Sequence, residues 1–161
     1  MDFEQTFRSL YPSLFRYLHR LTGDADVAED LAQESFVRLL GHRVSDDGVR
    51  VWLFTVATNL VRDGARKQAR RARILAAEPV LPGAFPAPDE GVEREARISA
   101  VRDALGHLAA RDRELLLMRE EGFSYAEIAR AAGVAPGSVG TLIARALRRF
   151  TQAYQTGEDD G

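Results

Sequence analysis

The sequence predicts an all-helical protein (all-α) of two small domains, joined by a flexible proline-rich linker, with a helix-turn-helix at the end of the second domain. Hydrophobic residues recur three or four positions apart over most of the chain, which is the spacing of one helix face. Four of the six prolines lie between residues 74 and 91, and they separate two such helical regions. Residues 124–150 carry a cap, a glycine and a proline where a helical corner needs them.

The first helical segment contains a proline. Its apolar face comprises Phe3, Phe7, Leu10, Leu14, Leu18 and Leu21. Because Pro12 removes a backbone donor and crowds the preceding turn, we expect a kink or a break near Tyr11. Residues 22–24 end this segment and start the next, in which Asp26 and Glu29, three residues apart, can open a second helix.

The second helix has an apolar side and an acidic side. The apolar side comprises Val27, Ala28, Leu31, Phe36, Leu39 and Leu40. The acidic side carries Glu29, Asp30, Gln33 and Glu34. A solvated face with carboxylates near a helix N-terminus is the simplest interpretation. A metal site is the weaker alternative, because no histidine stands at ligand spacing.

A loop over residues 41–48 precedes a third helix whose far end is basic. The apolar side of this helix comprises Val49, Leu53, Val56 and Leu60, and Trp52 widens it. From Arg62 to Arg73, six basic residues stand against one acid, a local net charge of +5. Such a run is most often a solvated surface.

The composition changes between residues 74 and 91, where prolines and glycines exclude a helix. We expect a flexible linker there, between a domain of residues 1–73 and a domain of residues 92–154. The second domain begins with an apolar face of Ile98, Val101, Leu105 and Leu108. A helix over residues 111–121 follows, and residues 155–161 are expected to be a disordered tail.

The helix-turn-helix is predicted from three local signals. Ser124 and Glu127 have the spacing of a capping box, Gly133 can take the left-handed turn that ends a helix, and Pro136 suits the first position of the next one. One face of the second helix is then free, and in DNA-binding proteins such a face enters the major groove. An ordinary helical hairpin in a core is the alternative. The presence of this motif in the same chain favours a role for the basic end of the third helix in contacting DNA phosphates.

Composition limits the other classes of function. The 161-residue chain has a net charge of −2 and no cysteine, which excludes disulfides and thiolate metal sites. No apolar run approaches the ~20 residues that span a bilayer, and the N-terminus is too polar for a signal peptide. We therefore expect a cytoplasmic protein without membrane insertion, metal or other cofactor.

Three motifs in order resemble the extracytoplasmic-function (ECF) sigma factors of bacterial RNA polymerase, in the sigma-70 superfamily. They are AEDLAQESFVRLL, VWLFTVATNLVRDGARKQARR and LAARDRELLLMREEGFSYAEIARAAGVAPGSVGTLIARAL. The resemblance implies a sigma factor without catalytic activity, whose partners are core RNA polymerase, promoter DNA and an anti-sigma factor. Residues 1–73 would bind polymerase and melt the minus-ten element, as sigma region 2 does, and residues 92–154 would bind the minus-thirty-five element, as region 4 does.

The resemblance also assigns roles to individual residues. Polymerase binding falls on Glu29, Asp30, Gln33 and Glu34. Minus-ten DNA binding falls on Asn59, Arg62, Arg66, Lys67 and Arg70, with the loop 41–48 as the wall of a base pocket. Minus-thirty-five binding falls on Ser138, Thr141, Arg145, Arg148 and Arg149. Trp52 could stack on a base, but its place on the apolar side favours core packing.

The chain departs from the family in its last helix. Family members often carry a basic residue where this chain has Gly140, Leu142 and Leu147. Fewer cations imply weaker or differently specified upstream binding, with a shallower salt dependence.

Two other functions remain open from the residues alone. A stand-alone helix-turn-helix regulator with a partner-sensing N-terminal domain would share the GFSYAEIARAAGVAPGSV segment, but it leaves the acidic second helix and the basic rod unexplained. An enzyme is disfavoured, because the three histidines are isolated and no glycine-rich phosphate loop is present.

Overall fold

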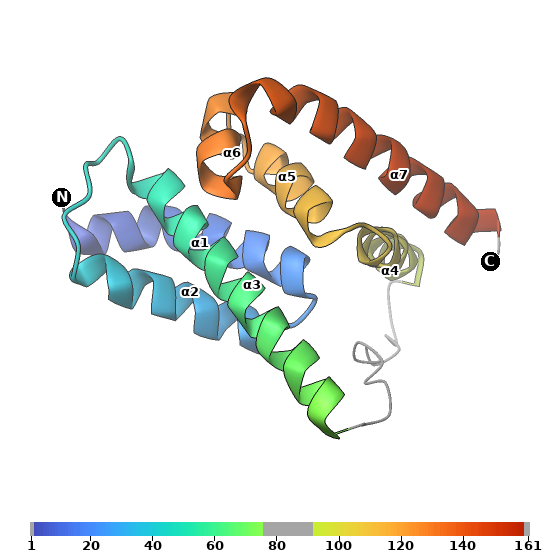
Figure 1. Cartoon of the computed structure of the whole chain (residues 1–161), viewed down its shortest axis with the longest axis horizontal. Helices are drawn as coiled ribbons and strands as arrows, with labels where there is room; N and C mark the ends of the chain where they lie inside the picture. Colours follow the sequence, from blue (N-terminus) through green and yellow to red (C-terminus); the bar gives the residue numbers. More distant parts are fainter. Residues whose placement is uncertain (1, 76–91, 160–161) are drawn as a thin grey trace.

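The structure, a computed structural model, describes residues 2–75 and 92–159. These residues form helices without any strand, which confirms the all-helical prediction. The helices are α1 (Phe3–Thr22), α2 (Ala25–Leu40), α3 (Val49–Leu75), α4 (Val92–Gly106), α5 (Ala110–Glu120), α6 (Tyr125–Ala132), the short 3₁₀ helix η1 (Pro136–Ser138) and α7 (Val139–Asp159). Helices α1 to α3 make up the N-terminal half and α4 to α7 the C-terminal half (Figure 1).

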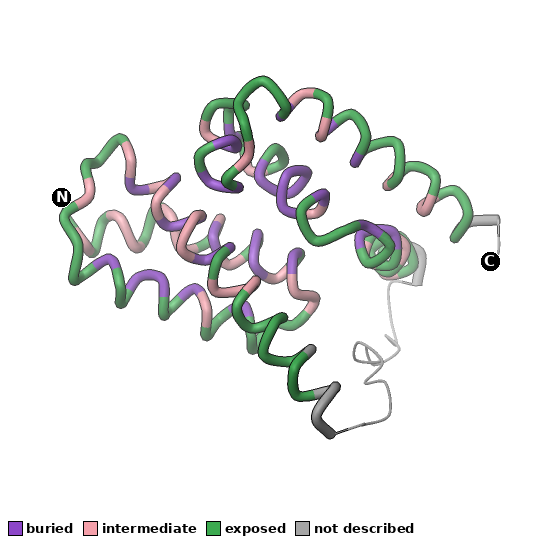
Figure 2. The backbone as a smooth tube through the Cα atoms, in the orientation of Figure 1, coloured by how far each residue is buried: buried purple, intermediate pink, exposed green. Residues whose placement is uncertain are grey.

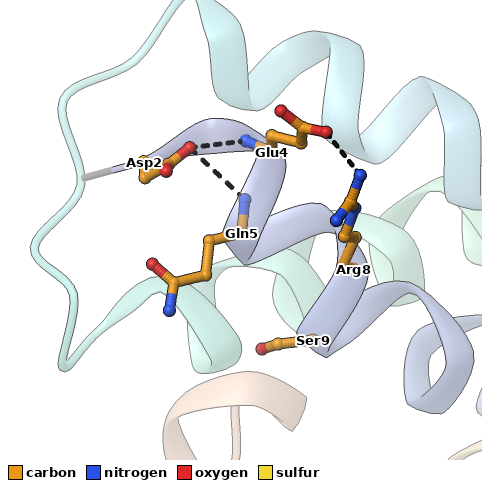
Figure 3. Close-up of a pocket in the computed structure, with 5 residues that line it drawn as sticks. All are labelled: Asp2, Glu4, Gln5, Arg8 and Ser9. Atoms are coloured by element: carbon orange, nitrogen blue, oxygen red, sulfur yellow. Dashed lines mark hydrogen bonds and ion pairs between the residues drawn. The ribbon is translucent and has the colours of Figure 1, made fainter.

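Helix α1 begins at a capped N-terminus. The Asp2 carboxylate accepts hydrogen bonds from the amides of Glu4 and Gln5 at 3.1 and 3.3 Å, and Glu4 pairs with Arg8 at 2.7 Å. These groups and Ser9 line a shallow hollow (Figure 3). Because the Asp2 and Glu4 carboxylates and the Arg8 guanidinium are engaged in these contacts, we interpret the hollow as a helix cap and not as a ligand site.

Pro12 lies inside the continuous helix α1, so that, of the kink or break expected near Tyr11, the break is wrong. Pro12 lacks the backbone donor that this position would otherwise offer to the carbonyl four residues earlier. The Tyr11 ring packs against the aromatic rings of Phe7 and Phe36, with centroids 4.9 and 6.1 Å away. This tertiary packing outweighs the local penalty of the proline.

The start of α2 also differs from the prediction. Its cap is Asp24, whose side chain accepts hydrogen bonds from the amides of Asp26 and Val27 at 2.9 and 3.2 Å. Asp26 lies inside the first turn, where it cannot serve as the cap. Only a residue just outside the helix, here extended with φ −133°, can turn its carboxylate back onto the free amides.

The helix-turn-helix is confirmed at its predicted signals. The Glu127 amide donates to the Ser124 hydroxyl at 3.2 Å, and the Ser124 amide donates to the Glu127 carboxylate at 2.8 Å, which completes the capping box. This interaction lowers the pKa of Glu127. Gly133 ends α6 in the left-handed conformation, with φ 73°. Pro136 starts the short η1 turn, so that the regular helix α7 begins three positions further on, at Val139.

The buried apolar residues of the two halves form one continuous cluster. Figure 2 shows where buried residues lie along the backbone. In the N-terminal half, Tyr17 is wholly buried and shares a hydrogen bond of 2.8 Å with the buried Thr58 hydroxyl. In the C-terminal half, Ile128 of α6 and Ile143 of α7 close the corner of the helix-turn-helix. Ile98 and Val101 were expected on one apolar face with Leu105 and Leu108, but they are 43% and 38% exposed, whereas Leu105 and Leu108 are buried.

The ends of the predicted domains fall on helices. Helix α3 extends to Leu75, and most of the predicted linker, residues 76–91, lies outside the described residues. Helix α7 continues past Tyr154 to Asp159, where a disordered tail was expected, and the Thr156 hydroxyl there donates to the Gln152 carbonyl at 2.8 Å. None of the helices described is both long and apolar enough to cross a membrane.

Candidate functional site

The acidic face of α2 is accessible to a partner. Glu29, Asp30, Gln33 and Glu34 are all exposed. Contacts between side chains one helical turn apart hold two of the carboxylates in place. The Gln33 side chain donates a hydrogen bond to Glu29 at 3.3 Å, and Arg38 pairs with Glu34 at 3.0 Å. The face therefore presents carboxylates in ordered positions.

Two large aliphatic side chains accompany these carboxylates. Val37 is 60% exposed and Leu40 is 66% exposed. The prediction that Leu40 belongs to the buried side of α2 is wrong, because its neighbour Leu39 points into the core and consecutive helical residues face about 100° apart. The periodicity could have shown that Val37 also lies off the core face, but its exposure was not predicted. Exposed aliphatic residues beside ordered charges are typical of a docking surface.

The loop after α2 forms a small hollow. His42, Arg43, Val44 and Ser45 line it. The His42 ring lies 2.8 Å from the Arg38 carbonyl oxygen and its centroid is 5.2 Å from the Trp52 ring. Trp52 is partly buried against the core, which supports the packing interpretation of this residue over the stacking one.

The basic end of α3 contains one arginine unlike its neighbours. Asn59, Arg66, Lys67 and Arg70 are exposed, and the Arg66 side chain, which is 77% exposed, lies 3.9 Å from the Asp63 carboxylate. Arg62 instead turns toward the C-terminal half. Its guanidinium donates to both Glu114 carboxylate oxygens at 3.0 and 2.8 Å and to the Ala132 carbonyl at 3.0 Å.

The Arg62–Glu114 pair is largely shielded from water. The Glu114 side chain is only 2% exposed and that of Arg62 is 27% exposed. Hydrogen bonding to Glu114 raises the pKa of Arg62 above its usual value. A bidentate arginine–carboxylate pair in such surroundings is among the stronger polar contacts in proteins.

A second cluster joins the halves around Glu121. Arg16 donates to both Glu121 carboxylate oxygens at 2.7 and 2.6 Å, and Arg20 approaches the same carboxylate at 3.8 Å. Arg50 donates to the Glu121 backbone carbonyl and its guanidinium lies 4.1 Å from the ring centroid of Phe123. The Phe123 ring in turn lies 4.7 Å from that of Phe54 in α3. None of these contacts was predicted from the sequence.

The face of the helix-turn-helix opposite the core carries the residues expected to bind the upstream element. Ser138 lies in η1 and Thr141, Arg145, Arg148 and Arg149 lie on α7, all exposed. Two of the arginines also contact the buried Asp112 carboxylate of α5, Arg149 at 3.1 Å and Arg145 at 3.9 Å. Asp112 therefore orients part of this basic face.

The positions where the chain departs from the family differ in environment. Gly140 and Leu142 are partly buried, whereas Leu147 is 45% exposed. Elsewhere, no group of three acidic or histidine side chains within residues 2–75 and 92–159 could hold a metal ion.

Comparison with known proteins identifies the family. Residues 6–71 match sigma-70 region 2 and residues 98–150 match sigma-70 region 4. The ECF RNA polymerase sigma factor SigL of Mycobacterium tuberculosis is 35% identical over 157 residues, which cover 92% of this chain and 88% of SigL. The chain belongs to the ECF sigma factors. These proteins are transcription initiation factors that bind DNA.

Further relatives agree with this assignment. The ECF RNA polymerase sigma factor EcfG of Rhodopseudomonas palustris is 31% identical, over 92% of this chain and 83% of that protein. The RNA polymerase sigma factor YlaC of Bacillus subtilis is 29% identical, over 89% and 86%. The sigma factor RpoE of Bartonella quintana, solved in complex with the anti-sigma factor NepR, has a similar fold, with a TM-score of 0.74 and 24% identity over 96% of this chain and 97% of that one.

Proposed function

We propose that this sigma factor binds core RNA polymerase through the acidic face of α2 and directs it to promoters through two DNA-binding surfaces, one in each half. The observation that carries the first part is the exposed face itself. It combines the carboxylates of Asp30 and Glu34 with the exposed aliphatic side chains Val37 and Leu40. Apolar contacts would supply affinity, while the carboxylates would speed encounter and set the register on a basic partner.

The N-terminal half would open and hold the minus-ten element. Asn59, Arg66, Lys67 and Arg70 lie exposed along one helix, as a surface that follows a strand backbone requires. The hollow lined by His42, Arg43, Val44 and Ser45 would receive an unstacked base. Unstacking costs a few kcal/mol, so that a pocket for the base and cations along the backbone would act together. Arg62 belongs to this set only once it is released from Glu114.

The C-terminal half would bind the minus-thirty-five element with η1 and α7. Ser138 and Thr141 lie near the start of the second helix, where recognition helices contact base edges, and Arg145, Arg148 and Arg149 follow one and two turns later, where phosphates are closest. With no cation at Gly140, Leu142 or Leu147, we expect weak upstream binding.

The domain boundaries and partners complete this proposal. Residues 1–73 and 92–154 would act as the two functional domains, in the cytoplasm, where polymerase and promoter DNA are found. An anti-sigma factor would control the chain, a proposal supported by the similar fold of the Bartonella quintana sigma factor that was solved together with NepR.

A retention experiment tests the polymerase-binding surface. Core RNA polymerase from the source organism is passed over immobilised wild type, Asp30→Lys/Glu34→Lys, and the control Asp103→Lys/Glu120→Lys, which reverses two exposed acids outside α2. We expect retention by the wild type and the control and loss with the α2 variant, whose fold is checked by circular dichroism. If the folded wild type retains no polymerase, the proposal fails, and a dimeric regulator on duplex DNA becomes the better explanation.

A further inference from the structure

The three arginines of the proposed upstream DNA surface have different electrostatic surroundings. Arg145, Arg148 and Arg149 are all exposed on α7. Arg149 lies 3.1 Å and Arg145 lies 3.9 Å from the carboxylate of Asp112. Arg148, by contrast, makes no ion pair within the part of the chain that the structure describes. One acid therefore serves two of the three cations that the proposed function assigns to this DNA.

Asp112 is a buried acid next to an exposed basic surface. Helices α5 and α7 pack side by side (Figure 1), and Asp112 lies in the first turn of α5, where a helix N-terminus favours a negative charge. Its side chain is only 3% exposed, so water and salt screen its charge less than they would at the surface. Each of its oxygens faces one arginine, Oδ1 toward Arg145 and Oδ2 toward Arg149.

The two arginines keep most of their hydrogen-bonding capacity for a ligand. Arg149 donates one N–H to Asp112, and the distance from Arg145 is that of an ion pair and not of a hydrogen bond. A guanidinium has five N–H donors, so the contact with Asp112 leaves most donors of both side chains for phosphate oxygens. The side chains of Arg145 and Arg149 are 47% and 53% exposed. Both can therefore be held in place and still contact DNA.

The carboxylate offsets part of the charge that attracts DNA. Arg145, Arg149 and Asp112 together carry a net charge of +1, about that of a single cation. Attraction to phosphates does not depend on the base sequence, and each neutralised phosphate adds ~0.9 to the slope of log K against log salt. A slope of that size is about an eightfold change in affinity for a tenfold change in salt.

We propose that Asp112 is a positioning residue of the upstream surface, which holds Arg145 and Arg149 in place and limits their combined attraction for phosphates to that of one net charge. This inference rests on the proposed function for its DNA target, and it adds an acid that lies outside the DNA-binding residues. With less attraction that is independent of sequence, base contacts from Ser138 and Thr141 account for a larger share of the binding. Asp112 thereby favours selective over general DNA binding.

Duplex binding by the full chain, without polymerase, tests this role. The affinities of the wild type and of Asp112→Asn for a fluorescein-labelled duplex of mixed sequence are measured by anisotropy over a range of salt concentrations. Asparagine keeps the size of the side chain and an oxygen that can accept from Arg149, so little besides the charge is removed. Relative to 1 M salt, we expect Asp112→Asn to bind about eightfold more tightly than the wild type at about 0.1 M, with a slope steeper by ~0.9.

Glu120→Gln is the matched control. It removes one carboxylate from the same helix, so the net charge of the chain changes equally. Glu120 is exposed and ends α5, ~12 Å along the helix axis from Asp112 at 1.5 Å per residue. This separation exceeds the Debye length of ~10 Å at 0.1 M salt. We expect the slope of Glu120→Gln to equal that of the wild type.

A second background separates an action through the arginines from a general effect of charge. In Arg145→Gln/Arg149→Gln the two cations are gone, but the amides can still donate to Asp112. Adding Asp112→Asn to this background should leave the slope unchanged, because no cation remains for the carboxylate to hold. If Asp112→Asn alone does not fold, as judged by circular dichroism, the background itself supplies the test. Its slope should fall by ~0.9, and not by the ~1.8 expected of two independent phosphate contacts.

The outcomes separate this inference from the proposed function. Equal slopes for the wild type and the folded Asp112→Asn would overturn the inference, and so would an effect of Asp112→Asn that persists in the glutamine background. Arg148→Ala tests the DNA surface itself. Weaker binding by Arg148→Ala beside an unchanged Asp112→Asn refutes the inference alone, whereas unchanged binding by Arg148→Ala refutes the proposed DNA surface and the inference with it.

Discussion

The buried hydrogen bond between Tyr17 and Thr58 allows a quantitative test of how α1 and α3 are held together. Both residues are 0% exposed, and their hydroxyls are 2.8 Å apart. Thr58→Val keeps the shape of the side chain but leaves the Tyr17 hydroxyl buried without a partner. A buried polar group in that state costs about 1–3 kcal/mol.

The complementary change should cost less. Tyr17→Phe leaves the Thr58 hydroxyl behind, and a helical threonine can turn its hydroxyl toward a carbonyl of the preceding turn. In the double variant Tyr17→Phe/Thr58→Val both polar groups are gone, so its cost should be clearly smaller than the sum of the two single costs.

Urea denaturation measures these three costs. Trp52 is the only tryptophan and lies on α3, so its fluorescence reports unfolding of the N-terminal half. With a urea dependence of about 2 kcal/mol per molar, a cost of ~2 kcal/mol lowers the midpoint by roughly 1 M. If the two single costs add within ~0.5 kcal/mol, the hydroxyls do not interact and the reasoning is refuted.

Four further predictions concern the C-terminal half. Ser124→Ala should destabilise it by ~1 kcal/mol, measured by urea denaturation followed by circular dichroism. The pKa of Glu127 is lower in the folded than in the unfolded chain, so the ionised carboxylate stabilises the fold at a pH above its unfolded-state pKa. This stabilisation is lost as the pH falls through the folded-state pKa. The loss of unfolding free energy caused by Glu127→Gln should therefore become smaller in acid. Arg148→Ala should weaken duplex binding for all sequences alike and reduce the slope of log K against log salt by ~0.9, and an unchanged slope would remove Arg148 from the phosphate contacts. Gly133→Ala should destabilise the protein by about 1–2 kcal/mol, because the φ angle of Gly133 is 73°. Gly140→Ala should stabilise it by about 0.5–1 kcal/mol, because the added Cβ would meet only Tyr125, at 3.6 Å. Changes of the same sign in both variants would contradict this backbone argument.

Features that depend on neighbouring residues, such as helix caps and turns, were predicted well from the sequence. The Ser124 and Glu127 capping box and the Gly133 turn depend on residues a few positions apart, so their spacing contains the necessary information. The exposed acidic face of α2 follows in the same way from helical periodicity. Residues 22–24 were expected to start the second helix, but the capping pair was placed at Asp26 and Glu29, because Asp26 offers the same side chain as Asp24 two positions later and the choice depends on which residue leaves the helix.

The contacts between the halves could not be predicted from spacing. Arg62 and Glu114 are 52 positions apart, and Arg16 and Glu121 are 105 apart. Each of these arginines has many acidic candidates along the chain, and only the three-dimensional arrangement selects one. For the same reason Arg62 was grouped with Arg66 on α3, although the structure shows that their surroundings differ.

Promoter-directed transcription by purified components tests the central claim most directly. Core RNA polymerase from the source organism is incubated with nucleotides and fragmented genomic DNA, with and without this protein, and the 5′ ends of the transcripts are mapped. We predict discrete start sites that require the protein and share sequence elements about 10 and 35 base pairs upstream, and that are lost with Asp30→Lys/Glu34→Lys. An unchanged pattern of start sites when the folded protein is added would contradict its assignment as a sigma factor.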